Sequence, residues 1–260
     1  MARVSLVDTR RDGPVCVLTL RREAKLNALS TELERQLKDA LGSEDVRSCG
    51  CLVLTGSGRA FSAGADVNEL RDRSPETVLA YYADTGDVYE RVAALPQPTL
   101  SAISGYCLGG GLELALATDF RIADETAVLG FPEASIGILP SSGGTQRLTR
   151  LLGPGRAREL MLLHDRVDAR EALAVGLVTE VVPAGAALER ALELARGLAE
   201  LPPLAVSLTK QAIDAMPESS RAAGILIERL AYGLLAQTDD ARGAADAFSR
   251  ERGSARRSGA

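Results

Sequence analysis

Apolar residues near the start of the chain follow first a strand pattern and then a helix pattern. Val4–Val7 and Val15–Leu20 are β-rich runs on either side of the turn-forming segment Arg11–Pro14, so they predict a β-hairpin. Leucines then recur at every fourth position from Leu33 to Leu41, which predicts a helix. Thr31–Glu34 offers this helix a capping box at its start.

The middle of the chain alternates buried strands with helices. Cys51–Thr55 is a continuous apolar run that ends at a glycine, which is typical of a strand covered by helices on both faces. Ser74–Pro75 is typical of an N-cap followed by a proline in the first helical turn, and it predicts a helix that ends at about Ala94. That helix carries Tyr81, Tyr82 and Tyr89.

The alternation continues downstream. A predicted strand over 99–103 precedes a glycine-rich turn, Gly105–Gly111, and an apolar helix over 112–117. Further strands are predicted at Phe120–Ala123, Val128–Phe131 and Leu177–Val182. Asp168–Glu171 caps a helix that stops near Gly176. Periodicity alone therefore favours an α/β protein with a doubly wound parallel sheet.

The strands cease after Pro202–Pro203. Residues from about 204 to 248 are helical by pattern, so we predict two domains, an α/β body over 1–200 that holds the binding site and a helical region over 201–260. Several leucines of this region are too apolar to be left in water: Leu226, Leu230, Leu234 and Leu235. We therefore expect the helical region to form a subunit interface.

The composition excludes nucleic acid as a partner. Lys and Arg number 30 against 35 Asp and Glu, a formal net charge of −5, and no basic block is long enough to follow a phosphate backbone. Aromatic residues make up only 3% of the 260 positions and Trp is absent. The chain therefore also lacks the stacking faces that single-stranded bases require.

Nothing in the chain predicts a membrane segment or a metal site. No run reaches the roughly 18 apolar residues of a spanning helix, and no apolar leader core follows Met1–Ser5. Four cysteines are too few and too unevenly spaced for a disulfide framework, and Cys49–Cys51 lacks partner ligands for a metal. We expect a cytoplasmic protein with reduced thiols and no membrane partner.

Gly105–Gly111 lies between a strand and a helix, where several chemistries occur. It lacks the lysine of a phosphate loop, and no G-x-G-x-x-G pattern occurs in the chain. A thiol nucleophile at Cys107 with His164, the only histidine, as its base would give a hydrolase. A tight turn that serves packing alone is another alternative. Finally, unpaired N–H groups of Gly109–Gly111 at a helix start would bind an anion.

A second glycine loop and two carboxylates extend the last alternative. Phe61–Asp66 follows a buried strand and can offer a further N–H, as in a two-donor oxyanion hole. Glu113 lies among apolar helix residues, surroundings that raise a carboxyl pKa, and Glu133 follows an apolar strand and a proline. Each alone is more often a capping or paired carboxylate. Together with the glycine turns they favour acid and base chemistry at a carbon next to a thioester carbonyl.

Four motifs, in order and at characteristic spacing, make the sequence similar to the enoyl-CoA hydratase/isomerase (crotonase) superfamily over about residues 4–252. They are Leu26–Leu29, Ala60–Asp66, Gly105–Glu113 and Gly143–Leu148. The resemblance implies an α/β fold in which a crotonase-like spiral of repeated ββα units is followed by a C-terminal helical trimerisation region. We adopt this fold as the prediction in place of the doubly wound sheet.

The resemblance also implies roles for individual residues. The N–H groups of Ala65 and Gly110 would form an oxyanion hole, and Glu113 and Glu133 would be the catalytic pair. The adenine end of CoA would lie against Ala24–Leu26 and the Ala63 carbonyl, with the Lys25 side chain as a phosphate partner. The implied substrate-binding residues are Ala24, Lys25, Ala63, Ala65, Asp66, Val67 and Gly110. No metal is implied, and no cofactor besides the coenzyme A of the substrate.

The chain departs from the family pattern at a few positions. Glu23 stands where an Arg-Pro pair has its proline, Ser141–Ser142 replace a step that commonly contains glycine, and Leu163–His164 replace a frequent Thr-Gly. The end, Arg250–Arg257, lacks the usual Phe-Lys close, which sometimes contacts CoA. None of these departures removes a catalytic group.

The resemblance implies a cofactor-independent hydratase that adds water reversibly, with syn geometry, to a trans-2-enoyl-CoA. Glu133 would donate and remove the C2 proton, and Glu113 would hold and activate the water. Two alternatives stay open: a Δ3,Δ2-enoyl-CoA isomerase, which needs one base, and a non-catalytic acyl-CoA-binding subunit of the same fold. We expect a homotrimer or a dimer of trimers, and the residues do not indicate which acyl group is bound.

Overall fold

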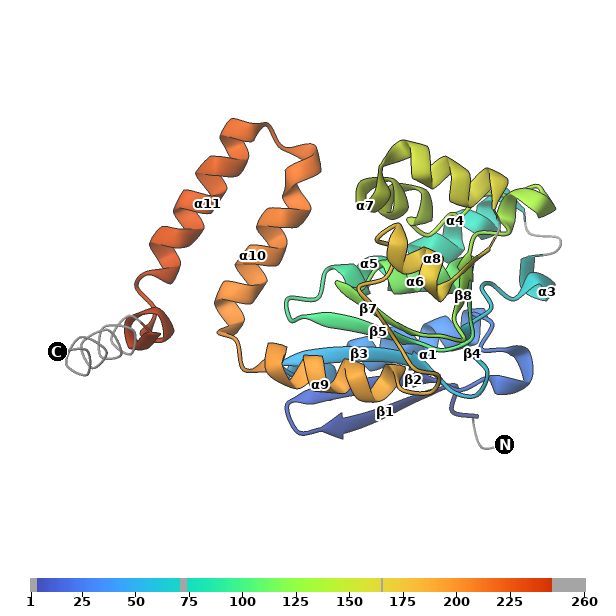
Figure 1. Ribbon diagram of the computed structural model, residues 1–260, viewed down its shortest axis with the longest axis horizontal. Helices are drawn as coiled ribbons and strands as arrows, with labels where there is room; N and C mark the ends of the chain where they lie inside the picture. The colour runs from blue at the N-terminus through green and yellow to red at the C-terminus, as the bar shows by residue number, and fades with distance from the viewer. Residues whose placement is uncertain (1–3, 71–73, 165, 245–260) are drawn as a thin grey trace. The chain divides into compact units, whose positions relative to one another are not determined.

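The chain forms two compact units. The computed structural model describes residues 4–70, 74–164 and 166–244, and it divides the chain into unit 1, residues 1–200, and unit 2, residues 201–260. Unit 1 contains two β-sheets with helices around them, whereas the described part of unit 2 is helical (Figure 1).

Unit 1 is built on two sheets whose strands alternate along the chain. The six-stranded sheet contains, in spatial order, β1 (Val7–Asp12), β2 (Val15–Leu20), β3 (Cys51–Gly56), β5 (Thr99–Ile103), β7 (Phe120–Asp124) and β10 (Glu180–Val182). The four-stranded sheet contains β4 (Ala60–Ser62), β6 (Tyr106–Leu108), β8 (Val128–Gly130) and β9 (Val167–Asp168). All neighbouring strands are parallel except the pairs β1–β2 and β8–β9.

The strand order identifies the topology. Both sheets advance in one direction from their first strand to their last, and the chain passes from the larger sheet to the smaller one at β3–β4, β5–β6 and β7–β8. A doubly wound sheet instead reverses its strand order. The doubly wound arrangement that periodicity favours is therefore wrong, because periodicity finds strands but not the sheet that each one joins. The spiral of ββα units is confirmed.

Helices cover these sheets in unit 1. The α-helices are α1 (Thr31–Leu41), α2 (Glu44–Arg47), α3 (Val67–Leu70), α4 (Pro75–Ala83), α5 (Val88–Ala93), α6 (Gly110–Leu116), α7 (Gly144–Arg158), α8 (Ala169–Ala174) and α9 (Ala187–Ala199). Shorter helical turns are η1 (Glu23–Lys25), η2 (Thr85–Asp87), η3 (Glu133–Ile136) and the π-helical η4 (Glu159–Leu163). The helical geometry of α7 is broken at Gly153, which precedes Pro154.

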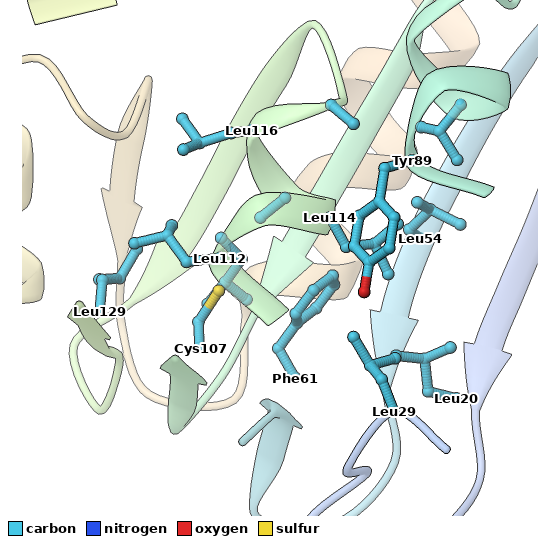
Figure 2. Packing of buried hydrophobic residues seen from close by; sticks show 14 of the residues in the cluster. Leu20, Leu29, Leu54, Phe61, Tyr89, Cys107, Leu112, Leu114, Leu116 and Leu129 are labelled. Atoms are coloured by element: carbon cyan, nitrogen blue, oxygen red, sulfur yellow. The ribbon is translucent and has the colours of Figure 1, made fainter. Parts of the chain in front are cut away.

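Side chains of the six-stranded sheet alternate between two apolar cores. On β3, Cys51 and Val53 belong to a cluster that includes alanines of α9. Leu52 and Leu54 point to the opposite face and join the larger core around α1 and α6, part of which Figure 2 shows. All four side chains are fully buried, so the prediction of a strand buried on both faces is confirmed.

The opening hairpin and the first helix differ slightly from the predicted bounds. The first strand is Val7–Asp12 rather than Val4–Val7, because Asp12 pairs with Val15 across a tight Gly13–Pro14 turn that sets the register. The predicted helix is present and begins at Thr31, but its cap is Ser30, whose Oγ accepts a hydrogen bond from the N–H of Leu33. The predicted capping box, which places the cap at Thr31, is therefore wrong by one residue.

Two further segments are divided more finely than predicted. The helix predicted to reach Ala94 is two helices, α4 and α5, separated by the turn η2, although Ser74 caps the first one as expected. Gly105–Gly111 contains the strand β6. A strand of three residues is too short to give an alternating pattern.

Unit 2 contains the helices α10 (Pro203–Ala215) and α11 (Arg221–Leu235), joined by η5 (Met216–Glu218). Neither α-helix has a buried residue, and their exposed large apolar side chains are Leu204, Ile213, Leu226, Ile227, Leu230, Tyr232 and Leu234. The predicted helical pattern is confirmed up to residue 235 and again over 239–244, while residues 245–248 lie outside the described part. Among the described helices, none is both long and apolar enough to cross a membrane.

Candidate active site

A cleft in unit 1 brings together residues from both glycine loops and both carboxylate positions. The predicted site residues that line it are Ala65, Asp66, Gly110, Glu113 and Glu133. Further polar residues of the lining are Thr31, Glu34, Glu69, Tyr81, Tyr82, Tyr89, Ser141 and Ser142, and its apolar residues are Leu29, Ile138 and Leu139. The cleft therefore holds both candidate catalytic carboxylates and both candidate oxyanion donors.

Glu113 is held rigidly from one side of the cleft. It lies on α6 and is 3% exposed. Its Oε1 accepts hydrogen bonds from the N–H groups of Ser142 at 2.7 Å and Gly144 at 2.8 Å. Burial raises the pKa of this carboxyl, and the two backbone donors act in the opposite direction. Because a backbone N–H makes the contact, the serine found at position 142 leaves the support of Glu113 intact.

Glu133 has fewer partners than Glu113. It begins η3 directly after Pro132 and is 9% exposed. Burial raises the pKa of its carboxyl to about 7, and the negative charge of Glu113 acts in the same direction. Its Oε2 is buried and has no hydrogen-bond partner in the described part of the chain. A carboxyl with this pKa exchanges a proton readily near neutral pH.

The N–H groups of Ala65 and Gly110 lie close together. A Cβ added to Gly110 would be 3.5 Å from the nitrogen of Ala65. Gly110 is the first residue of α6, where an N–H has no partner within the helix. Neither N–H donates to an acceptor among the residues described. With the positive end of the α6 dipole behind them, the two groups are suited to bind a negatively charged oxygen.

The three glycines at the start of α6 have different roles. The N–H of Gly109 donates to the carbonyl of Gly130 at 2.9 Å, so the prediction that all three N–H groups are unpaired is wrong at this position. Gly109 has a φ of +51°, and a Cβ there would approach Glu133 Oε1 to 2.5 Å. A Cβ on Gly111 would lie 2.5 Å from the carbonyl oxygen of Ser62. Close packing thus requires glycine at 109 and 111. Gly110 is the first residue of α6 and lies at the candidate oxyanion hole.

The residues predicted to contact the CoA moiety lie outside the cleft lining. Ala24 and Lys25 are exposed on η1, and the N–H of Ala63 donates to the carbonyl of Leu26 at 2.9 Å. Asn27 fixes this loop, because its buried Nδ2 donates to two backbone carbonyls, at 2.9 and 2.7 Å. The loop and the strand β4 are therefore joined as one rigid segment.

Asp66 and Val67 extend the loop that follows β4. Asp66 lines the cleft, and its carboxylate forms an ion pair with Arg22 at 2.7 Å. Hydrogen bonding to Arg22 holds the pKa of Asp66 below its ordinary value. Val67 opens α3, and its side chain is outside the described part.

Cys107 and His164 do not share a site. Cys107 is fully buried on β6, and Figure 2 shows its sulfur among leucines of the core, including Leu112 and Leu129. Burial raises the pKa of this thiol. His164 is exposed after η4, and neither residue lines the cleft. Among the described residues no three His, Cys, Asp or Glu side chains are grouped to hold a metal ion.

Sequence reasoning did not identify Glu34 as part of the cleft. Its side chain is 2% exposed and accepts hydrogen bonds at Oε1 from the hydroxyls of Tyr81, at 2.7 Å, and Tyr89, at 2.9 Å. The available signal was its position, because Glu34 directly follows Leu33 on the buried face of α1. A carboxylate on such a face requires buried partners.

Comparison with known proteins identifies the family of the chain. The model of the enoyl-CoA hydratase/isomerase family matches residues 10–256. The chain is 39% identical over 244 residues to the 2,3-dehydroadipyl-CoA hydratase of Escherichia coli, covering 93% of this chain and 94% of that protein. It is 35% identical over 244 residues to the short-chain-enoyl-CoA hydratase of Clostridium acetobutylicum, with the same coverage of 93% and 94%.

A solved structure shows the same fold. The crystal structure of an enoyl-CoA hydratase from Bacillus anthracis superposes with a TM-score of 0.88 at 38% identity, over 95% of this chain and 97% of that one. The sequence match, the shared spiral and the coverage of nearly the whole chain lead to one conclusion: the chain belongs to the enoyl-CoA hydratase/isomerase family.

Proposed function

We propose that the chain is an acyl-CoA hydratase that adds water reversibly across the C2–C3 double bond of a trans-2-enoyl-CoA. The observation that carries this proposal is the presence of two buried carboxylates, Glu113 and Glu133, in one cleft with the close N–H groups of Ala65 and Gly110. The names of relatives at 35% to 39% identity, which are hydratases of CoA thioesters, support it further.

The paired N–H groups would stabilise the charge that develops on the substrate. When oxygen attacks C3, electrons move through the double bond to the thioester carbonyl oxygen, which becomes an enolate. The N–H groups of Ala65 and Gly110 would donate to that oxygen in a cleft where they need no reorganisation. Losing one oxyanion donor of this kind costs about 3 kcal/mol of transition-state stabilisation in other enzymes.

The two carboxylates would divide the proton transfers. Glu113, oriented by two backbone donors, would accept a proton from the water that attacks C3. Glu133, with a pKa raised to about 7, would deliver a proton to C2 and remove it in the reverse direction. The hydroxyl joins C3 and the proton joins C2 from the same side, which gives syn addition.

The CoA moiety would bind beside the cleft at the loop that follows β2 and contains η1. Lys25 is exposed on η1 and would pair with a phosphate, while Ala24 and the carbonyl of Ala63 would contact the adenine. Asp66 and Val67 follow the candidate oxyanion donor and would border the thioester end. In this proposal the reaction uses no metal and no cofactor besides the coenzyme A of the substrate.

The assembly would be a homotrimer or a dimer of trimers in the cytoplasm. Its basis is the apolar surface of α10 and α11, where Leu226 and Leu230 are 57% and 62% exposed in the single chain. Apolar side chains gathered on one pair of helices are typical of a subunit interface.

The proposal is tested by product analysis with crotonyl-CoA and a series of longer and branched enoyl-CoA thioesters. A hydratase forms 3-hydroxyacyl-CoA and releases no free CoA, and kcat/KM across the series would identify the acyl group. Release of free CoA that is lost in Cys107→Ala and kept in Glu133→Gln would favour the thiol hydrolase. Conversion of a 3-enoyl-CoA without hydration would favour the isomerase, and binding without turnover would favour the non-catalytic subunit.

A further inference from the structure

Arg147 lies near the start of α7, where a cation is not expected. The helix begins at Gly144 and has no acidic residue in its first turn. A positive charge near a helix start opposes the helix dipole. The side chain of Arg147 is nevertheless largely buried, with 15% of its surface exposed. An arginine that is buried at the unfavourable end of a helix requires another explanation.

The guanidinium of Arg147 joins the segment 141–144 to α5. Its Nη1 donates a hydrogen bond to the carbonyl oxygen of Ser142 at 2.8 Å, and its Nη2 forms an ion pair with Glu90 of α5 at 2.6 Å. Gly143, with a φ of +95°, makes room for this arrangement, because a Cβ there would lie only 2.1 Å from Nη1. The two contacts therefore fix the segment that precedes α7.

The segment 141–144 also supplies the backbone donors of Glu113. The N–H groups of Ser142 and Gly144 donate to Glu113 Oε1 at 2.7 and 2.8 Å. Arg147 binds the carbonyl of the same Ser142 whose N–H orients the carboxylate. Arg147 is not part of the cleft lining. Its support of Glu113 is therefore indirect and passes through the backbone.

The charge of Arg147 acts on Glu113 as well. Burial raises the pKa of the Glu113 carboxyl, and among the cations of the described chain Arg147 opposes this effect most strongly. The ionisable groups that face Glu113 from other elements are Glu133 of η3 and Tyr89 of α5. The strands β4 and β6, which also contact α6, consist of uncharged residues. Arg147 thus favours the ionised form of a carboxyl whose surroundings favour the neutral one.

Given the hydratase proposed above, we propose that Arg147 is a positioning residue for the reaction: through the backbone of Ser142 and Gly144 it holds the Glu113 carboxylate in the orientation that accepts a proton from water. Its charge keeps Glu113 ionised, as a base must be. Glu133, whose pKa is raised to about 7, keeps the proton that is delivered to C2. The position of Arg147 at the helix start follows from this role.

Arg147→Gln tests the proposal through the pH dependence of crotonyl-CoA hydration. In the wild type, kcat/KM should fall at low pH, where Glu113 takes up a proton, and at high pH, where Glu133 loses one. Without the arginine charge the pKa of Glu113 rises, so the low-pH limb should move upward by about one pH unit. A misdirected carboxylate acts on the transition state, so kcat should fall at least about tenfold while KM changes less than about threefold.

Two further variants separate this role from general damage to α7. Arg147→Lys keeps the charge but lacks the planar fork that reaches both Ser142 and Glu90, so it should restore the low-pH limb and leave kcat at least about threefold below the wild type. Arg156→Gln, which changes a 47% exposed arginine near the end of α7, is the control and should leave kcat and both limbs unchanged. A folded Arg147→Gln protein with the kcat and the low-pH limb of the wild type would overturn the proposal.

If Arg147→Gln does not fold, Arg147→Lys decides alone. A lysine variant with the kcat of the wild type would show that the two contacts of the guanidinium are not needed, which contradicts the proposal.

An infrared titration separates the role of Arg147 from the hydratase itself, because it measures the Glu113 carboxyl without turnover. Glu113→Gln, made in the wild type and in Arg147→Gln, identifies the band of this carboxyl in each protein. An inactive wild type in which Arg147→Gln raises the pKa of Glu113 would refute the hydratase and retain the role of Arg147. An active wild type with the same Glu113 pKa and the same kcat as Arg147→Gln would do the reverse.

Discussion

The two units of the chain use their apolar residues in opposite ways. In unit 1, leucines such as Leu37 and Leu54 are fully buried, and two apolar cores cover both faces of the six-stranded sheet. In unit 2, α10 and α11 bury no residue, and Leu230 and Leu234 are 62% and 63% exposed. Burying a leucine side chain contributes about 2 kcal/mol, so a further surface that covers these leucines would stabilise unit 2.

This contrast separates the chemistry from the assembly. Every residue that lines the candidate active cleft belongs to unit 1, and its position follows from the packing of that unit. Substitutions in the two units should accordingly have different effects, on turnover in the first and on subunit number in the second.

The largest effect is expected from a charge placed on the apolar surface of unit 2. Leu230→Glu should convert a trimer or hexamer into monomers, because burying an unpaired carboxylate at an interface costs several kcal/mol per chain. Light scattering coupled to size exclusion measures the mass, which should be near three or six chains for the wild type. Glu228→Gln on the same helix is the control and should keep the assembly. A wild-type protein that is monomeric at micromolar concentration would contradict the assignment of assembly to unit 2.

Substitution of either catalytic candidate should affect turnover and leave the assembly unchanged. Glu113→Gln and Glu133→Gln are each expected to lower kcat for hydration at least about 100-fold, the smaller range for losing a general acid or base. Affinity for a saturated acyl-CoA should change little. Either variant with near wild-type turnover would contradict a mechanism that uses both carboxylates.

The pH dependence of stability should show how much folding free energy unit 1 loses by burying Glu133 in the candidate active cleft. Burial raises the pKa of Glu133 from an ordinary 4.5 to about 7. Between these values the folded chain keeps a proton that the unfolded chain has released, so the free energy of unfolding falls as the pH rises from about 4.5 to about 7. Glu133→Gln removes this pH-dependent loss, so the variant should be more stable than the wild type by about 3 kcal/mol at pH 8 but by only about 1 kcal/mol at pH 5.

Urea denaturation at the two pH values, at equal protein concentration, measures this difference. Asp39→Asn, whose carboxylate is 65% exposed, should show no such trend. If the difference in stability between Glu133→Gln and the wild type is the same at both pH values, this carboxyl titrates normally in the folded chain.

The smallest effect is expected for the buried thiol of Cys107. Cys107→Ala should retain most hydratase activity and lose about 1 kcal/mol of stability, because the side chain fills space in the core. Cys51→Ala, at a fully buried thiol in the second core, should cost a similar amount. Loss of all activity in Cys107→Ala alone would give this thiol a chemical role.

Sequence patterns predicted the elements of unit 1 better than their arrangement. The run Cys51–Thr55 and the caps at Ser74 and Asp168 depend on neighbouring residues, so their physical causes are readable in the chain. The order of strands depends on which sheet each one joins, which local periodicity does not encode. Only the resemblance carried by four separated motifs supplied the spiral.

In the candidate site, too, local motifs were predictable from the sequence and contacts between distant residues were not. Glu113, Glu133 and the loop glycines stand in recognisable motifs, whereas the hydrogen bonds of Glu34 join α1, α4 and α5 through contacts between residues that are 47 and 55 positions apart. The Glu113 carboxylate likewise depends on N–H groups of Ser142 and Gly144. A backbone donor leaves no trace in residue type, so neither set of partners was predictable from the residues alone.

The alternation of strands between two sheets has a consequence for how unit 1 folds. β3 and β5 are neighbours in one sheet, but β4 lies between them in sequence and pairs with β6 in the other. Neither sheet can be completed by a continuous stretch of chain, and each parallel pairing must close a long loop. Unit 1 should therefore lose both sheets in a single cooperative step, and the amide protons of β3 and of β6 should become accessible to exchange with the same free energy.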